Sequence, residues 1–253
     1  MRITFLGTGT SQGIPVIGSH HPVCKSNDPK DQRLRVSIHL EWEGKSFVVD
    51  CGPDFRQQML RAQIDSIDAL LITHEHADHV AGLDDIRPYC FKQGPLPIYA
   101  SKRVAENLEY RFAYIFEMVN KYPSAPTVQM NIIDDEPFTA LGLTVIPLEV
   151  DHLKLTVTGF RFGDFAYITD AKNIPEATIS KLRGVKTLVL NALRQESHPS
   201  HFNLSEALGI IDVIKPERAY LTHISHHMGF HEEVQESLPE HVYLAYDGLV
   251  LEL

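Results

Sequence analysis

Apolar and polar residues alternate along several short runs in the first part of the chain. In residues 36–42 every second residue is apolar, which is typical of a strand with one buried face. Similar runs predict strands over residues 3–6, 46–49 and 68–72, and the spacing of apolar residues predicts a helix over 54–62. This part of the chain is therefore expected to form consecutive strands of one sheet.

Beyond residue 72, predicted helices and strands alternate. Strands are expected near residue 98 and over 145–148, 156–162, 165–168, 187–190, 219–221 and 242–245. Helices are expected over 101–109, 111–119, 175–182 and 204–213, with another starting near 231. This order favours an α/β fold in which helices cover two sheets on the outside.

The pattern indicates a single domain over residues 1–253, because it contains no repeat, low-complexity tract or Gly/Ser linker. Residues 88–126 are the least strand-like and the richest in aromatic side chains. We interpret them as a helical insertion that packs a small core of its own. The alternative is a lid or a wall of the substrate site.

Composition narrows the class of protein. A chain of 253 residues with 43% hydrophobic residues can bury a large core. The net charge of -10, from 23 basic and 33 acidic residues, disfavours nucleic-acid and anionic-membrane binding. Three widely spaced cysteines do not form a disulfide framework, and no apolar run approaches the length of a membrane span. We therefore expect a cytoplasmic protein.

Four side chains with metal-binding atoms lie in residues 74–79, His-Glu-His-Ala-Asp-His, directly after a buried strand. Imidazole and carboxylate donors suit Zn, Mn or Fe better than Ca or Mg. The alternative is a solvated His-rich loop. Because six residues are too few to enclose two metals, further ligands are needed, and His152, Asp170 and His223 each follow an apolar strand.

These motifs resemble the metallo-β-lactamase superfamily of binuclear metallohydrolases, and the resemblance spans essentially the whole chain. It implies an αββα four-layer sandwich of two mixed β-sheets flanked by helices, with the site at one edge of the sheets. It also implies two divalent ions, Mn or Zn, and a support for one ligand histidine from Asp50. The implied ligands are His74, His76 and His152 for one ion, Asp78, His79 and His223 for the other, and Asp170 between them.

The ends of the chain narrow the resemblance further. Residues 5–15, Phe-Leu-Gly-Thr-Gly-Thr-Ser-Gln-Gly-Ile-Pro, and residues 221–226, Leu-Thr-His-Ile-Ser-His, are similar to the phosphoribosyl cyclic phosphate phosphodiesterase group. tRNase Z is a neighbour that shares the opening Gly-Thr-Gly. The opening glycines are one residue too far apart for a dinucleotide fingerprint, so a tight glycine turn between strands is the better interpretation. The absence of cysteine at position 170 separates the chain from the β-lactamase branch.

That phosphodiesterase group also implies a separate structural zinc site near residues 19–24, Ser-His-His-Pro-Val-Cys. Ser19 stands where the group has a cysteine. Candidate ligands are therefore His21, Cys24 and His226, with His20 or His227 as a fourth. A metal-free polar loop is the alternative.

The resemblance implies hydrolysis of a small cyclic or nucleotide-like phosphodiester by a metal-bridging hydroxide. Asp78 and His201 are the candidate catalytic residues, and His201 would protonate the leaving alkoxide while titrating near neutral pH. Alternatively, His201 merely precedes a helix capped by Asn203 with Glu206 in a capping box. His198 is the second candidate for the proton donor.

Three other functions compete with this hypothesis. A tRNA 3′ endonuclease would need a basic arm to grip the tRNA, and none is recognisable in the sequence. A non-catalytic metal-binding or carrier protein has little need of seven ligands. A thiolester hydrolase is disfavoured by the opening motif and by His201. We expect a small-molecule partner rather than nucleic acid or a membrane, and a homodimer is a candidate assembly.

Overall fold

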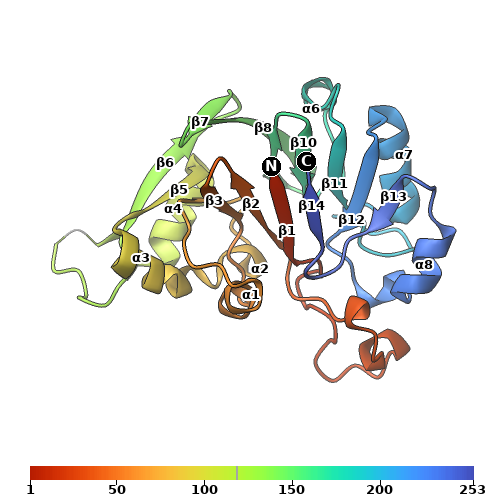
Figure 1. Cartoon of the computed structure of the whole chain (residues 1–253), viewed down its shortest axis with the longest axis horizontal. Helices are drawn as coiled ribbons and strands as arrows, with labels where there is room; N and C mark the ends of the chain where they lie inside the picture. Colours follow the sequence, from red (N-terminus) through yellow and green to blue (C-terminus); the bar gives the residue numbers. More distant parts are fainter. Residues whose placement is uncertain (118) are drawn as a thin grey trace.

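The computed structural model describes residues 1–117 and 119–253 and shows two facing β-sheets with helices on their outer sides (Figure 1). Each sheet has seven strands, in the order β14-β1-β2-β3-β4-β5-β6 and β13-β12-β11-β10-β9-β8-β7. Both sheets mix parallel and antiparallel pairs. This is the αββα sandwich expected from the sequence.

The strands of the first sheet are β1 (Arg2–Gly7), β2 (Ser37–Trp42), β3 (Lys45–Val49), β4 (Ala69–Leu71), β5 (Leu96–Ser101), β6 (Val128–Ile133) and β14 (Val250–Glu252). Those of the second are β7 (Phe138–Ala140), β8 (Leu143–His152), β9 (Leu155–Phe162), β10 (Phe165–Ile168), β11 (Thr187–Asn191), β12 (Arg218–Thr222) and β13 (Val242–Leu244). The α-helices are α1 (Phe55–Ala62), α2 (Ala77–Val80), α3 (Arg87–Gln93), α4 (Lys102–Arg111), α5 (Ala113–Phe116), α6 (Glu176–Lys181), α7 (Leu204–Ile214) and α8 (His231–Ser237). Short 3-10 helices are η1 (Pro22–Lys25), η2 (Pro29–Asp31), η3 (Leu83–Ile86) and η4 (His226–Met228).

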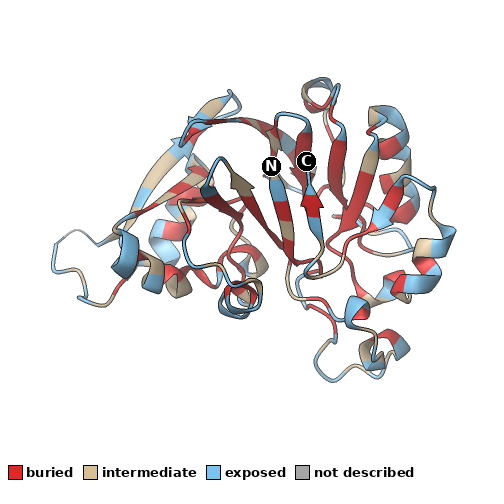
Figure 2. Ribbon diagram, in the orientation of Figure 1, coloured by how far each residue is buried: buried red, intermediate tan, exposed pale blue. Residues whose placement is uncertain are grey.

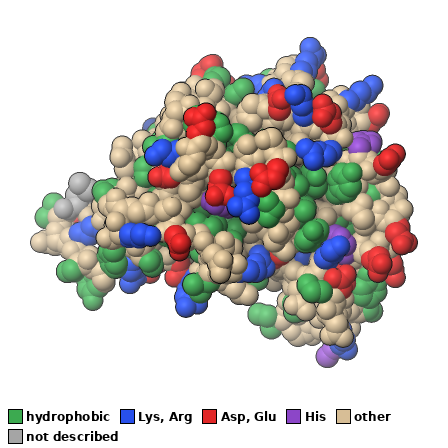
Figure 3. Space-filling view, in the orientation of Figure 1, with side chains coloured by type: hydrophobic (Ala, Val, Ile, Leu, Met, Phe, Trp, Pro, Cys, Tyr) green, Lys and Arg blue, Asp and Glu red, His purple; other side chains and the backbone are tan. Residues whose placement is uncertain are grey.

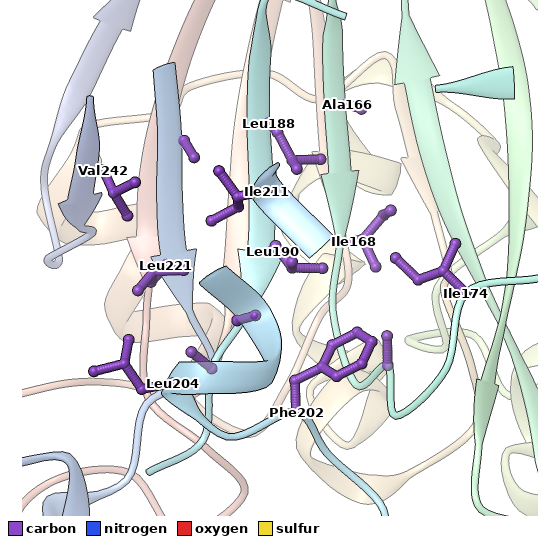
Figure 4. Close-up of a cluster of buried hydrophobic side chains, with 14 of the residues drawn as sticks. Ala166, Ile168, Ile174, Leu188, Leu190, Phe202, Leu204, Ile211, Leu221 and Val242 are labelled. Carbon is purple, nitrogen blue, oxygen red and sulfur yellow. The ribbon is translucent and has the colours of Figure 1, made fainter. Parts of the chain in front are cut away.

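Successive side chains of a strand point to opposite faces of its sheet, so the buried side chains form three cores. Ile38 and Leu40 of β2 face the space between the sheets, whereas Val48 of β3 lies in the core under the helices of the first sheet. A third core lies between the second sheet and its helices, where Ile211 of α7 packs over the strands (Figure 4). The strands are accordingly buried and the outer helix faces exposed (Figure 2). No helix of the described residues is long and apolar enough to cross a lipid bilayer.

Residues 88–126 differ from the expected helical insertion. They include β5, which pairs with β4 and β6 inside the first sheet. Val104 and Leu108 of α4 share a core with Leu70 of β4, so the expectation of a separate small core is wrong.

The helix expected over residues 111–119 is also shorter than the sequence suggested. α4 ends at Arg111, and Phe112 leaves the helical conformation with φ -119° and ψ 39°. α5 then ends at Phe116, and position 118 of the expected helix lies outside the described residues. Because the aromatic residues Phe112 and Phe116 pack against the core, the spacing of apolar residues in the sequence does not reveal the break.

Candidate metal centre

The ligand candidates follow strands that end at one edge of the sandwich. His74 follows β4, Asp170 follows β10 and His223 follows β12. The two sheets meet there, because the amide of Thr158 in β9 donates to the carbonyl of Thr73 at 3.1 Å. The carboxyl ends of parallel strands are a common place for ligand sites, and here the ends of β4, β10 and β12 lie beside the candidate ligands.

Three overlapping groups of side chains have ligand atoms within 4.8 Å of one another. They are His74, His76 and His152; Asp78, His79, Asp170 and His223; and His152, Asp170 and His201. Every one of the seven expected ligands lies in one of these groups. Because His152 and Asp170 each belong to two groups, the groups form one continuous cluster.

In the first group, three imidazoles face one another. His74 Nε2 lies 3.0 Å from His76 Nδ1. His152 Nδ1 donates to the carbonyl of Ser200 at 2.8 Å, which leaves its Nε2 free for a metal. A hydrogen bond on one ring nitrogen that frees the other is the usual arrangement of a ligand histidine.

Asp170 lies at the centre of the second group. Its Oδ2 is 3.2 Å from His79 Nε2, and its Oδ1 is 3.2 Å from His223 Nε2. Both nitrogens are buried and have no hydrogen-bond partner among the described residues. Buried nitrogens are rarely left unpaired, so these two fit a site that a divalent ion completes.

Asp50 supports this cluster from behind, as expected. Its Oδ2 accepts from His79 Nδ1 at 2.7 Å and from the hydroxyl of Thr73 at 2.8 Å, and its Oδ1 accepts from the amide of Thr73 at 2.8 Å. Asp50, Asp170 and His223 all have a positive φ, of 65°, 58° and 56°. Such conformations are uncommon outside glycine and concentrate at functional sites.

Burial and neighbouring charges set the protonation states of the side chains in the cluster. Burial lowers the pKa of His74 well below its ordinary value, so its imidazole is neutral. Burial would raise the pKa of Asp170, but His223 and His79 lower it well below its usual range. Burial would likewise lower the pKa of His79, but the carboxylates around it, Asp170 first, raise it well above its ordinary value. The carboxylates therefore stay charged and attract a cation.

Two glycines allow the loop of Asp50 to approach α2. A Cβ on Gly52 would lie 2.0 Å from the carbonyl oxygen of Asp78, and one on Gly82 would lie 2.2 Å from that of Gly52. No other residue fits at these positions without moving the backbone that carries Asp78.

The opening glycines form a turn against neighbouring backbone, as the sequence suggested. Gly9 forms bridges with Arg35 and with Ile224, and a Cβ on Gly7 would lie 1.9 Å from the carbonyl oxygen of Arg35. The opening motif therefore packs beside the strand end that carries His223.

His201 lies inside the cluster, with Nδ1 3.7 Å from Asp170 Oδ1. Its loop is fixed on both sides. Phe202 inserts into the core beside Ile168 and Ile174 (Figure 4), and the predicted capping box is present, with Asn203 and Glu206 exchanging bonds of 2.8 and 2.9 Å.

The expectation that His201 titrates near neutral pH does not hold in this structure. Burial, followed by the charge of His223, lowers the pKa of His201 to about 3. His201 is therefore a neutral imidazole at pH 7.

The expected structural zinc ligands are only partly brought together. The ring centroid of His21 lies 5.0 Å from that of His226 and 5.4 Å from that of His227. Cys24 Sγ instead accepts from the amide of Val16 at 3.5 Å. Among the described residues, none of the three compact ligand groups contains His21, Cys24 or His226.

Sequence reasoning missed the residues that orient the ligands. Thr73 and Ser200 act through hydroxyl and carbonyl groups, which carry no sequence signature. Glu75 lies inside the histidine motif, and its carboxylate pairs with Arg103 of α4 at 2.6 Å. The sequence signal for this contact was a charged residue, Glu75, between two candidate ligand histidines.

Comparisons with known proteins agree with this geometry. Residues 45–224 match the model of the "Beta-lactamase superfamily domain". The chain is 42% identical over 252 residues to an octanoyltransferase of Porphyromonas gingivalis, covering 98% of this chain and 51% of that protein. The chain spans about half the length of the curated relatives that it matches first.

Two solved structures superpose on the whole chain. A "new diphosphatase from the PhnP family" superposes with a TM-score of 0.93 at 41% identity, covering 100% of this chain and 97% of the other. The short form of human tRNase Z superposes with a TM-score of 0.71 at 18% identity, over 100% and 99% of the two chains. The second likeness shows a shared fold alone.

Proposed function

This chain belongs to the metallo-β-lactamase superfamily and is PhnP-like, and from this premise we propose that it hydrolyses a small cyclic or nucleotide-like phosphodiester. The position of Asp170 carries the proposal. Its two oxygens each lie 3.2 Å from a buried histidine nitrogen that lacks a hydrogen-bond partner among the described residues. The donor set suits two divalent ions, Mn²⁺ or Zn²⁺.

We assign the ligands as the resemblance implies. One ion would be held by His74, His76 and His152, the other by Asp78, His79 and His223, with Asp170 contacting both. When bound, such ions supply Lewis-acid activation of water and of the phosphoryl oxygens.

His201 would act as the proton donor in this proposal. An anionic phosphoryl group beside the neutral imidazole would raise its pKa toward neutrality, so that the ring takes up a second proton from solvent. His201 can then pass a proton to the oxygen of the leaving group. Its fixed loop would hold the ring at that oxygen.

The charge of the chain supports a small substrate. Acidic residues outnumber basic ones, 33 to 23. On the face seen in Figure 3, Lys and Arg are interspersed with Asp and Glu. A tRNA substrate would favour a continuous basic surface.

A second candidate substrate is a diphosphate linkage, because the relative at 41% identity is called a diphosphatase. The octanoyltransferase is matched over only half of its length, so its name does not assign an activity to this chain. The site of this chain carries His and Asp donors suited to hydrolysis rather than acyl transfer.

Hydrolysis of bis(p-nitrophenyl) phosphate by protein loaded with Mn²⁺ or Zn²⁺, beside a chelator-stripped sample, tests the proposal. A dinucleoside diphosphate is assayed in parallel. Metal-dependent release of nitrophenol supports the phosphodiesterase, and cleavage of the diphosphate alone supports the second candidate. Inactivity toward both, with two ions bound per chain, would contradict both.

A further inference from the structure

Helix α4 holds the metal-binding loop through two arginines. Arg103 Nη1 donates to Glu75 Oε1 at 2.6 Å, and Arg111 Nη1 donates to the carbonyl oxygen of Glu75 at 2.6 Å. Glu75 separates the candidate ligands His74 and His76. One helix therefore restrains both the side chain and the backbone of the residue between two ligands.

Arg103 also reaches the second sheet. Its Nη2 donates to the carbonyl of Thr156 in β9 at 2.5 Å. β9 is the strand whose Thr158 bonds to Thr73, just before the ligands. A planar guanidinium can make both bonds at once, which a lysine ammonium cannot do with the same geometry.

The Glu75 carboxylate needs this cation. Its side chain is 14% exposed, and its Oε2 is buried with no hydrogen-bond partner among the residues described. Glu75 belongs to none of the three ligand groups, so its carboxylate lies outside them. A buried carboxylate that loses its partner is strongly unfavourable, and a divalent ion held by His74 and His76, its two neighbours in the chain, would offer a replacement cation.

We propose that Arg103 and Arg111 are positioning residues of the metal centre. They fix the loop so that both imidazoles face one ligand position, and Arg103 keeps the Glu75 carboxylate from occupying a coordination position that the substrate needs. This inference rests on the proposed metal centre. It gives α4 the function of supporting the site.

Cobalt binding tests the proposal independently of activity. Visible spectra are recorded during Co²⁺ titration, and Zn²⁺ affinity is measured by competition with a chelating dye. The variants are Arg103→Met, Arg103→Lys and the double variant Glu75→Gln/Arg103→Met. Lys102→Ala is the control, because Lys102 lies on the same helix in an exposed pair with Glu106 at 3.9 Å.

Arg103→Met is expected to bind Zn²⁺ about 10- to 100-fold more weakly. Its Co²⁺ absorption should weaken, because an added carboxylate ligand raises the coordination number. The double variant has no carboxylate to add to the ion, so its Co²⁺ spectrum should regain the wild-type shape while its Zn²⁺ affinity stays lowered. Arg103→Lys should show an intermediate affinity, and Lys102→Ala should match the wild type.

If Arg103→Met keeps the wild-type metal affinity and spectrum, the proposal is overturned. The proposal is also overturned if this variant is less stable but binds metal with unchanged affinity, because the contact is then merely structural. If Arg103→Met does not fold, Arg103→Lys carries the test, and wild-type behaviour of that variant overturns the proposal. Failure of the wild type itself to bind Co²⁺ or Zn²⁺ would instead overturn the proposed metal centre.

Discussion

His79 Nδ1 lies 2.7 Å from Asp50 Oδ2, and both side chains are fully buried. The same aspartate accepts the amide and the hydroxyl of Thr73, which precedes His74. One carboxylate therefore orients a ligand imidazole and the start of the loop that carries the other ligands. The turn at Asp50 and the histidine motif act as one unit although 23 residues separate Asp50 from Thr73.

Asp50→Asn tests this unit, because asparagine keeps the size of the side chain and tolerates the φ of 65°. Its single amide oxygen cannot replace both carboxylate oxygens, so either the bond from the Thr73 amide or the bonds from His79 and the Thr73 hydroxyl are lost. We expect metal affinity to fall about 10- to 100-fold and the free energy of unfolding to fall by about 1–3 kcal/mol. Chelator competition and urea unfolding measure the two effects, with the exposed Asp164→Asn as control. Unchanged metal affinity would show that the support is dispensable.

His201→Ala tests the proton donor. We expect turnover to fall about 10²- to 10⁴-fold while the metal content per chain, measured by atomic emission, stays at the wild-type value. His198→Ala should have a smaller effect, because His198 belongs to none of the three ligand groups. Loss of metal from His201→Ala would mean that the third ligand group, with His152 and Asp170, binds an ion through His201.

Asn203→Ala tests the loop that presents His201. The variant loses the bond from the Asn203 side chain to the amide of Glu206, which should lower the free energy of unfolding by about 1 kcal/mol. We also expect a lower kcat with little change in KM, because the loop of His201 ends at this cap. Asn203→Asp keeps the capping acceptor and should retain both properties. If the stability falls but kcat keeps its wild-type value, the cap does not contribute to catalysis.

The gathering of the candidate ligands at one sheet edge was predictable, because His74, Asp170 and His223 each come shortly after an apolar strand. The strands that the sequence did not reveal, β6, β7 and β14, lie at or next to sheet edges, where packing on one side imposes only a weak pattern. The support of Glu75 by Arg103 could not be predicted either. It depends on how α4 is placed against the loop, and no local periodicity encodes that placement.

Metal binding should stabilise the folded protein. The buried nitrogens of His79 and His223 have no hydrogen-bond partner within the described part of the chain, so an ion satisfies groups that are otherwise unpaired. At an ion concentration 100 times the dissociation constant, the gain is about 2.7 kcal/mol. Thermal unfolding with Zn²⁺ or with EDTA measures it. Asp170→Asn should show a much smaller increase, and an equal increase in that variant would place the ion elsewhere.

His231 should make stability depend on pH through a site remote from the metal ligands. Its side chain is 5% exposed, and its Nδ1 lies 3.1 Å from Arg33 Nη2. Burial, followed by the charge of Arg33, lowers the pKa of His231 to about 4. Lys30 adds to this effect, whereas Asp28 and Asp31 oppose it.

In the unfolded chain the pKa of a histidine is about 6.5. Between pH 6.5 and pH 4, the unfolded chain therefore binds a proton that the folded protein does not, and stability falls as pH falls. The contribution is complete above pH 6.5 and decreases by about 3 kcal/mol toward pH 4. His231→Gln keeps an acceptor for Arg33 but does not titrate, so its stability should depend less on pH. Urea unfolding of chelator-treated proteins at pH 7, 6, 5 and 4.5 measures the difference, with the exposed His241→Gln as control. Parallel curves for the wild type and His231→Gln would show that His231 does not carry this pH dependence.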